Sequence, residues 1–358
     1  MRLSKASLTL LTMLLFVMIL SLPFLLPSGA ITRQANRAYL DAAMQAQEDD
    51  VEESGPESDL SEDFISGARL RDTLRPAAVL ASAGISDILP VNDISALPID
   101  NSPGRAPIEA NFTETSYRDD TIIVEMEQLR KFDSDVFVAH VKIATASQLR
   151  TAYAGSRIDS DRTNQPSRIA RNYNAIVAVN GDYYPKTMAG YIVRQGEIYR
   201  QKTSKNMDLL LIDEWGDFHI LRYGHDNQKE GIKAFKAEHE LINGFFFGPA
   251  LVMDGEVLEI PKHYQFDPFS PNPRAAIGQT GPLTYVIVTV NGRTDASTGV
   301  TLAQLAGIMG ELGCTQAYNL DGGNSATLVF HGDVYNDKPQ SERDVTDIIY
   351  FASATEGQ

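Results

Sequence analysis

The most informative stretch of this chain lies at residues 319–327 and reads Asn319-Leu320-Asp321-Gly322-Gly323-Asn324-Ser325-Ala326-Thr327. It follows one apolar segment, 314–320, and leads into another, 326–330, and both are typical of short strands. Glycine permits positive φ and lets a ligand approach the backbone, while Asp and Asn either bond their own turn or reach outward. The stretch therefore predicts a tight turn between two strands, which either carries a carboxylate site or is a plain Asx-type turn.

The segment before this turn predicts a helix over 301–312. Thr301 is a suitable N-cap, apolar residues recur at helical spacing, and Gly313 suits the C-terminal end. Cys314, the only cysteine, begins the apolar segment that follows, so an intramolecular disulfide is excluded. We expect Cys314 to be a small buried hydrophobe rather than a catalytic thiol.

Short segments rich in Val, Ile and aromatic residues recur through the rest of the C-terminal region. They predict strands at 121–126, 135–143, 175–180, 191–194, 209–212, 218–221, 251–253, 257–258, 275–278 and 285–290. The dipeptide Asp254-Gly255 predicts a tight hairpin between two of them. Many strands and few helices predict the α+β class, with a single domain built on a twisted, mostly antiparallel or mixed sheet and a few flanking helices.

The N-terminal region predicts membrane targeting. Arg2 and Lys5 precede an apolar run over 8–26, so we expect a signal anchor or signal peptide over 1–30, with the anchor favoured. Everything downstream should then lie outside the cytoplasm, at the cell membrane or secreted. Residues 31–107 predict a spacer that contributes little to folding, because they are acidic and then punctuated by prolines. The folded domain is expected over 108–358.

Bulk charge and composition narrow the function classes. The net charge of −16 argues against nucleic-acid binding, which requires a basic surface. Ten acidic and no basic residues lie between Asp41 and Asp63, so most of this charge belongs to the spacer. The six histidines and one cysteine form no metal-binding spacing, so no metal and no cofactor are predicted.

Four further segments accompany the Asp-Gly-Gly turn. They are Ala178-Val179-Asn180-Gly181-Asp182-Tyr183-Tyr184, Phe247-Gly248-Pro249-Ala250-Leu251-Val252, Asn272-Pro273-Arg274-Ala275-Ala276-Ile277-Gly278 and Arg343-Asp344-Val345-Thr346-Asp347-Ile348-Ile349. In this order, and over roughly 117–354, they resemble the phosphodiester glycosidase family. The resemblance implies one compact catalytic domain that hydrolyses a sugar-1-phosphodiester, with a glycan or sugar phosphate of the cell envelope or an exopolysaccharide as substrate. Asn324 and Ala326 depart from the commoner family form Gly-Gly-Gly-Ser-Ser.

Cleaving the C1–O bond of such a substrate passes through an oxocarbenium-like state, with a phosphate ester as leaving group. The chemistry requires a carboxylate at the anomeric carbon, and a cation or backbone N–H groups at the phosphate. Asp182 and Asp321 are the predicted catalytic carboxylates, with acid and base roles unassigned. The predicted substrate- or phosphate-binding residues are Asn180, Gly181, Arg274, Asn319, Gly322, Gly323, Ser325 and Arg343. We expect Asp182, Asp321 and Arg274 to share one pocket.

Structural roles remain open for these residues. The two carboxylates are also suited to stabilising their turns, the arginines to forming ion pairs and the asparagines to capping. At the level of the whole protein, the alternatives are a non-catalytic glycan-binding or polysaccharide-assembly protein on the same scaffold, and a glycosidase that acts on neutral sugars.

Overall fold

The computed structural model describes residue 89 and residues 94–356, except 187–188, 204–205, 337 and 339–340. The predicted signal anchor and most of the spacer lie outside this part of the chain. Within it, no helix is both long enough and apolar enough to cross a membrane.

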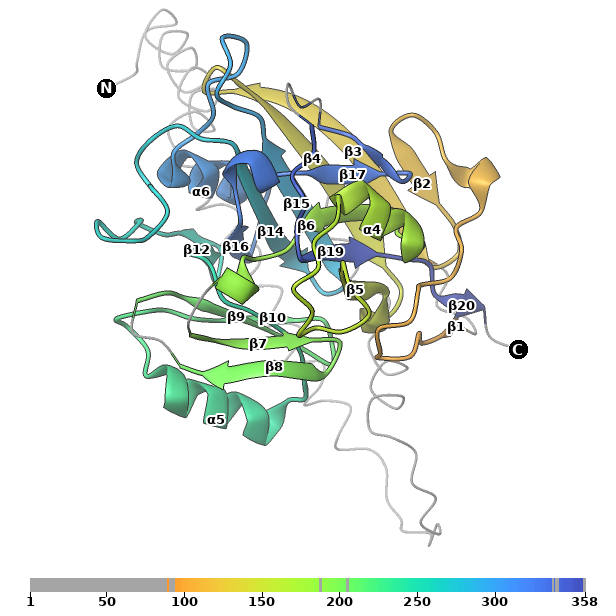
Figure 1. Ribbon diagram of the computed structural model, residues 1–358, viewed down its shortest axis with the longest axis horizontal. Helices are drawn as coiled ribbons and strands as arrows, with labels where there is room; N and C mark the ends of the chain where they lie inside the picture. The colour runs from red at the N-terminus through yellow and green to blue at the C-terminus, as the bar shows by residue number, and fades with distance from the viewer. Residues whose placement is uncertain are drawn as a thin grey trace, which may run out of the picture. The chain divides into compact units, whose positions relative to one another are not determined.

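Antiparallel pairing organises the described chain into three large sheets and one two-stranded ribbon (Figure 1). The largest, here the β14 sheet, has the order β13 (Glu256–Val257), β12 (Ala250–Met253), β16 (Gln316–Leu320), β14 (Arg274–Gly281), β15 (Thr284–Val290), β4 (Ser134–Ile143), β3 (Ile122–Lys131) and β2 (Ser116–Arg118). The β6 sheet has the order β18 (Asp333–Val334), β17 (Leu328–Phe330), β6 (Val177–Asn180), β19 (Asp347–Phe351) and β5 (Leu149–Tyr153). The β9 sheet has the order β10 (Phe218–Leu221), β9 (Leu209–Asp213), β11 (Leu241–Phe245), β7 (Gly190–Arg194) and β8 (Glu197–Lys202).

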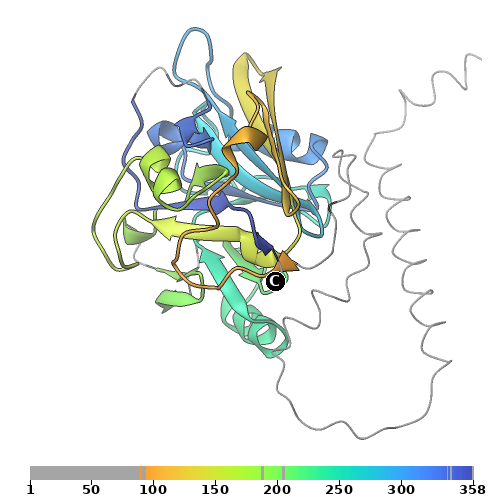
Figure 2. The same ribbon diagram turned by 90° about the vertical axis from the view of Figure 1, so that its right-hand side faces the viewer.

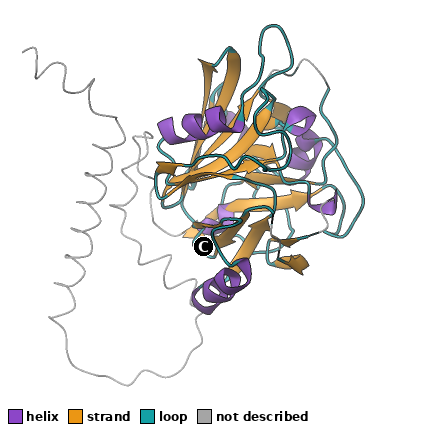
Figure 3. Cartoon of the chain, turned by 90° about the vertical axis from the view of Figure 1, so that its left-hand side faces the viewer, coloured by secondary structure: helices purple, strands orange, loops and turns teal. Residues whose placement is uncertain are grey.

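Three α-helices lie on the outside of these sheets in the described residues: α4 (Pro166–Asn172), α5 (Gln228–Glu238) and α6 (Leu302–Glu311) (Figure 3). The α+β class is confirmed, with antiparallel rather than mixed sheets. Sheet exceeds helix more than expected, and three sheets replace the single one predicted.

Alternation along the strands explains the layering. On β15, Val286 and Val288 pack with α6 on one face of the β14 sheet, whereas Tyr285 and Ile287 face the main core between the sheets. The outer face of the β6 sheet is covered in the same way by α4, where Ile169 packs against strand residues of β6 and β19. The core therefore lies between sheets, and the helices close its outer faces.

Local signals explain which elements were predictable. Thr301 and Gln304 form the capping box that starts α6, and Cys314 beyond its end is buried, as predicted. Asp254 and Gly255 both take positive φ, 50° and 76°, which gives the tight hairpin between β12 and β13. The helix α5 was not predicted, because its sequence is largely polar and only three of its residues are buried.

The chain joins this fold upstream of residue 108, the boundary expected from the sequence. β1 (Ile94–Ser95) pairs with β20 (Thr355–Glu356), which places the start of the packed chain beside its C-terminal end (Figure 2). The fully buried guanidinium of Arg150 donates to the carbonyls of Pro98, Asp100 and Ser102. Residues 94–107 therefore pack on the domain, which revises the expectation that the whole spacer contributes little to folding.

Candidate functional site

The site begins where two turns meet. β6 ends at Asn180 and β16 ends at Leu320, and the Asp321 N–H donates to the Gly181 carbonyl at 3.4 Å. The chain then crosses from the β14 sheet to the β6 sheet through residues 321–327. Asn180 holds this crossing, because its Nδ2 donates to the Asp321 carbonyl at 2.7 Å and its Oδ1 accepts from the Thr327 N–H at 3.1 Å.

Asn180 and Gly181 support the turns rather than offering groups to a ligand. The Asn180 side chain is fully buried and bonded to backbone at both ends. A Cβ on Gly181 would lie 2.4 Å from a carboxylate oxygen of Asp347, so glycine is required there for close packing. Both residues are where the sequence analysis expected a site, but their polar groups are directed into the protein.

Asp182 belongs to a buried cluster of three charged residues, here the Arg194 cluster. Arg194, at the end of β7, donates from Nη2 to Asp182 at 2.7 Å and from Nε to Asp347 at 2.7 Å, and all three side chains are fully buried. The second Asp182 oxygen accepts the Phe246 N–H at 2.8 Å. Asp182 thus accepts from Arg194 and from the N–H groups of Tyr184 and Phe246, and its side chain does not face solvent.

Two carboxylates share one guanidinium in this cluster. Burial raises the pKa of Asp347 to about 7, against the attraction of Arg194 and with the added repulsion of Asp182. Burial also raises the pKa of Asp182, again opposed by Arg194. With their pKa values raised, the two carboxyl groups hold a proton more readily than free ones, so at most one negative charge in the cluster is left unbalanced by Arg194.

Asp321 differs from Asp182 in being partly exposed. The Ser325 side chain and the Gly322 N–H favour the charged form of its carboxyl group. Burial raises its pKa above the ordinary range, and the nearby negative charge of Asp182 adds to the rise, while Ser325 and Arg343 oppose it. Asp321 is thus a carboxyl with raised basicity at a partly exposed position.

An exposed arginine and an aromatic ring accompany this carboxylate. Arg343, in the segment before β19, is close enough to Asp321 to stabilise its charge. The Arg343 guanidinium carbon also lies 5.8 Å from the centroid of the partly buried Tyr183 ring. We refer to Asp321, Arg343 and Tyr183 as the Asp321 site.

The Arg274 guanidinium is bonded to backbone carbonyls beside this site. Its backbone lies next to the Ala275–Leu320 pair, beside the start of the turn. Its side chain donates instead to the carbonyls of Val300 at 3.1 Å, Asp267 at 2.7 Å and Ser270 at 3.0 Å. Burial lowers its pKa to about 10. The Arg274 guanidinium thus orders the loop over 266–270, and the expectation that Asp182, Asp321 and Arg274 share one pocket stays a prediction.

Asn319 and the glycine turn are likewise used within the protein. Asn319 Nδ2 donates to the Gly248 carbonyl at 2.7 Å, and its side chain is buried. Gly323 takes φ +59° and donates its N–H to the Pro273 carbonyl at 2.8 Å. A Cβ on Gly322 would meet that same carbonyl at 2.8 Å. These glycines allow the turn to pack tightly, and the Gly323 N–H is bonded within the protein.

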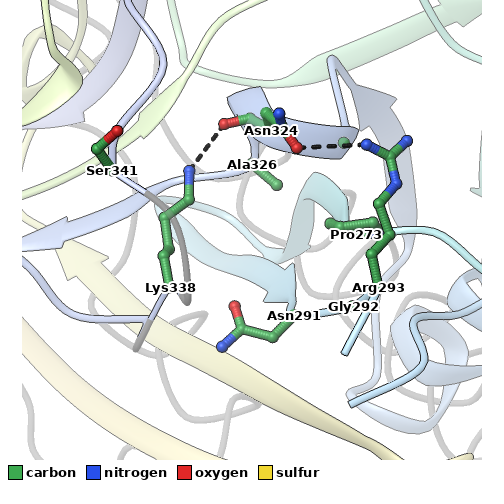
Figure 4. Close-up of a pocket in the computed structure, with 9 residues that line it drawn as sticks. Pro273, Asn291, Gly292, Arg293, Asn324, Ala326, Lys338 and Ser341 are labelled. Carbon is green, nitrogen blue, oxygen red and sulfur yellow. Dashed lines mark hydrogen bonds between the residues drawn. The ribbon is translucent and has the colours of Figure 1, made fainter. Parts of the chain in front are cut away.

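Two cations that the sequence analysis missed flank the same turn. In Figure 4, Lys338 reaches Asn324 from one side and Arg293 from the other. Lys338 Nζ donates at 2.8 Å to the Asn324 carbonyl, and Arg293 Nη1 donates at 3.3 Å to the Asn324 side chain. The cavity between them measures 30 Å³, enough for water but not for a sugar. No spacing pattern marks either residue, because each comes from a loop distant in sequence.

Comparison with known proteins adds a family match. The family model for phosphodiester glycosidase matches residues 173–352 of this chain. The SPbeta prophage-derived uncharacterized protein YomE of Bacillus subtilis (strain 168) is 35% identical over 108 residues, which are 30% of this chain and 17% of that protein. The chain therefore matches only a small part of that relative's length.

A solved structure has a related fold. The catalytic domain of zebrafish N-acetylglucosamine-1-phosphodiester alpha-N-acetylglucosaminidase, auto-inhibited by its pro-peptide, is 15% identical with a TM-score of 0.50, over 76% of this chain and 99% of that one. A hypothetical protein from Synechocystis is 16% identical with a TM-score of 0.46, over 65% of this chain and 62% of that one. At such identity the zebrafish likeness shows the fold alone.

Proposed function

The chain belongs to the phosphodiester glycosidase family, a family of hydrolases, and from this premise we propose that it cleaves the C1–O bond of a sugar-1-phosphodiester at the Asp321 site. The sugar ring would lie against Tyr183, with its anomeric carbon at Asp321 and the phosphoryl group at Arg343. Guanidinium offers planar, paired N–H groups that match phosphate oxygens. The substrate would be a glycan of the cell envelope or an exopolysaccharide.

One observation carries this proposal: in the part of the chain that the structure describes, the partly exposed Asp321 lies close to the cation of Arg343. A glycosidase for neutral sugars uses two carboxyl groups, one of which protonates a poor leaving group. Here the second carboxylate, Asp182, is fully buried and bonded to Arg194. A phosphate ester leaves without such protonation, so one carboxylate and one arginine are sufficient. The geometry therefore favours a phosphodiester substrate over a neutral glycoside.

The reaction follows from these positions. Water attacks the anomeric carbon as the C1–O bond breaks, and its proton passes to Asp321, whose raised pKa makes it a stronger base. The electron pair of the broken bond stays with the phosphate, where the Arg343 guanidinium balances the charge. Asp182 is a positioning residue, because its negative charge acts on Asp321 from within the Arg194 cluster.

An extracytoplasmic location is part of the proposal. It is supported by Arg2 and Lys5 ahead of the apolar run over 8–26, the arrangement of an export signal or signal anchor. The acidic spacer that follows would separate the domain from the membrane surface. Protease treatment of intact cells tests this: removal of the domain is expected, and complete protection would contradict an outside location.

A side-by-side substrate screen tests the activity. The full-length protein, purified in mild detergent, is assayed against nitrophenyl glycosides and against sugar-1-phosphodiesters of the same sugars. We expect turnover of at least one phosphodiester and little of its matched glycoside. Faster cleavage of the glycosides would favour a glycosidase for neutral sugars. Saturable binding of glycans without any turnover would favour the non-catalytic alternative.

A further inference from the structure

A second cluster of polar side chains lies on the β9 sheet and shares no residue with the Asp321 site. Asp213 ends β9, His219 lies on the neighbouring strand β10, and His239 directly follows α5. One ligand atom from each lies within 4.8 Å of the other two. Asp213 Oδ2 is 2.9 Å from His219 Nε2 and 3.2 Å from His239 Nδ1.

The carboxylate is held in place by its own turn. Asp213 Oδ1 accepts the N–H groups of Trp215 at 2.8 Å and Asp217 at 2.9 Å. Its other oxygen is thereby directed at the two histidines, and the Asp213 side chain is buried. Such backbone support of a carboxylate is typical of the shell that orients metal ligands.

The histidine rings are fixed by packing. The centroids of the two rings lie 4.7 Å apart. Both rings also contact Phe235 of α5, with centroid-to-centroid distances of 5.0 Å for His219 and 5.3 Å for His239. His239 Nδ1 is buried and, among the described residues, forms no hydrogen bond of acceptable geometry, although Asp213 is near. A buried ring nitrogen without a hydrogen bond is costly unless another partner uses its lone pair.

We propose that Asp213, His219 and His239 bind one zinc ion. Ligand atoms about 2.0–2.1 Å from a tetrahedral zinc lie roughly 3.3 Å apart. The distances from Asp213 Oδ2 to the two histidine nitrogens, 2.9 and 3.2 Å, are close to this value. Two imidazoles and one carboxylate form a donor set that suits zinc and related divalent metals. The histidines are partly exposed, which leaves a fourth position for water. The ion would join the β9–β10 hairpin to the end of α5.

The sequence conceals this site, because its ligands are six and then twenty residues apart, with a helix between the histidines. The competing interpretation is an Asp–His–His hydrogen-bonded cluster that needs no ion. The zinc site predicts that the protein binds one metal ion with high affinity, whereas the hydrogen-bonded cluster predicts no such binding.

The single tryptophan supplies a reporter. Trp215 lies two residues from Asp213 and donates its backbone N–H to that carboxylate, so metal binding should change the fluorescence of the nearby indole. The full-length, untagged protein is freed of metal with a chelator and titrated with zinc, while calorimetry measures stoichiometry. We expect one saturable site and a rise in melting temperature with zinc concentration. Titration with cobalt should add the visible absorption of a low-symmetry cobalt centre.

Matched variants make the result decisive. His219→Ala and His239→Ala should each weaken zinc binding at least tenfold, by removal of a direct ligand. Asp213→Asn keeps an oxygen for the Trp215 and Asp217 N–H groups, so the turn should fold while affinity falls by a similar factor. His263→Ala changes an exposed histidine elsewhere and should leave binding unchanged. Absence of a saturable site in the wild type, or equal affinity in all four variants, would overturn the proposal.

Discussion

Asp321 is a partly buried carboxyl whose charge is opposed by its surroundings, which is a feature of functional rather than stabilising residues. Because burial raises its pKa, the folded state holds the proton to a higher pH than the unfolded chain does. Its contribution to the free energy of unfolding therefore falls as pH rises from 3.8 through the raised pKa. A carboxyl retained at such a cost is expected to serve the reaction.

Replacing Asp321 by Asn should lower turnover by about two to four orders of magnitude, since the general base is lost. The variant should be as stable as the wild type at acid pH and more stable above the raised pKa, where only the wild type has a buried charge. Kinetics together with urea unfolding at several pH values check both parts. A large loss of stability at neutral pH would show that Asp321 mainly supports its turn.

Arg343 is predicted to discriminate between substrates. Arg343→Lys keeps the positive charge but loses the paired N–H groups, so kcat/KM for a sugar-1-phosphodiester should fall about tenfold or more. Activity or binding toward a neutral glycoside of the same sugar should change little. Arg274→Lys provides the comparison: because Arg274 holds the loop over 266–270, this change should alter stability and both substrates alike. Equal losses on both substrates for Arg343→Lys would contradict its role at the phosphate.

At this scale the sequence predicts part of the site. Asp321 and Arg343 were predicted and lie within electrostatic reach of one another. Asp182 was predicted to be catalytic without regard to Arg194. The two side chains form an ion pair, and both are buried away from solvent. An arginine at the end of an otherwise apolar strand was a usable signal of a buried ion pair. Arg293 and Lys338 carried no such signal, because only the fold brings their loops together.

At the scale of elements, the Arg194 cluster joins β7 of the β9 sheet to β19 and to Asp182, two residues beyond the end of β6. Arg194→Met leaves two buried carboxylates without their cation, which should lower the free energy of unfolding by about 3–5 kcal/mol. Chemical unfolding measures this loss. Arg157→Met is the matched control, since Arg157 pairs with Asp159 at an exposed site and should change stability little. Equal effects of the two changes would show that the cluster does not hold the sheets together.

Elements differed in how well their sequences predicted them. Strands such as β10 and β15, and the helix α6, were predicted because apolar periodicity and the Thr301 cap agree locally. The helices α4 and α5 were missed, since one is short and the other is mostly polar. Pairing partners were also not predictable, because β6 finds β17 and β19 more than a hundred residues away.

At the scale of the whole molecule, residues 94–107 form part of the packed chain although their composition suggested a spacer. A protein that begins at Ile108 would leave the buried Arg150 guanidinium without three carbonyl acceptors. Compared with one that begins at residue 89, it should melt at least about 5 °C lower. Differential scanning calorimetry of the two proteins checks the expectation.

A double-mutant cycle separates this contact from a general effect of truncation. In an Arg150→Met background, the same truncation should cost clearly less, because the charge that needs those acceptors is gone. Identical losses in both backgrounds would show that residues 94–107 act through other contacts. Equal melting temperatures of the two wild-type proteins would restore the boundary at residue 108.

The central claim is that this protein breaks the bond between the anomeric carbon and oxygen, with Asp321 as base. Hydrolysis of a sugar-1-phosphodiester in ¹⁸O-labelled water, followed by mass spectrometry of both products, tests it most directly. We expect the label to enter the free sugar and Asp321→Asn to slow its incorporation by orders of magnitude. Label in the released phosphate would show cleavage of the P–O bond, and undiminished labelling by the variant would place the reaction away from Asp321.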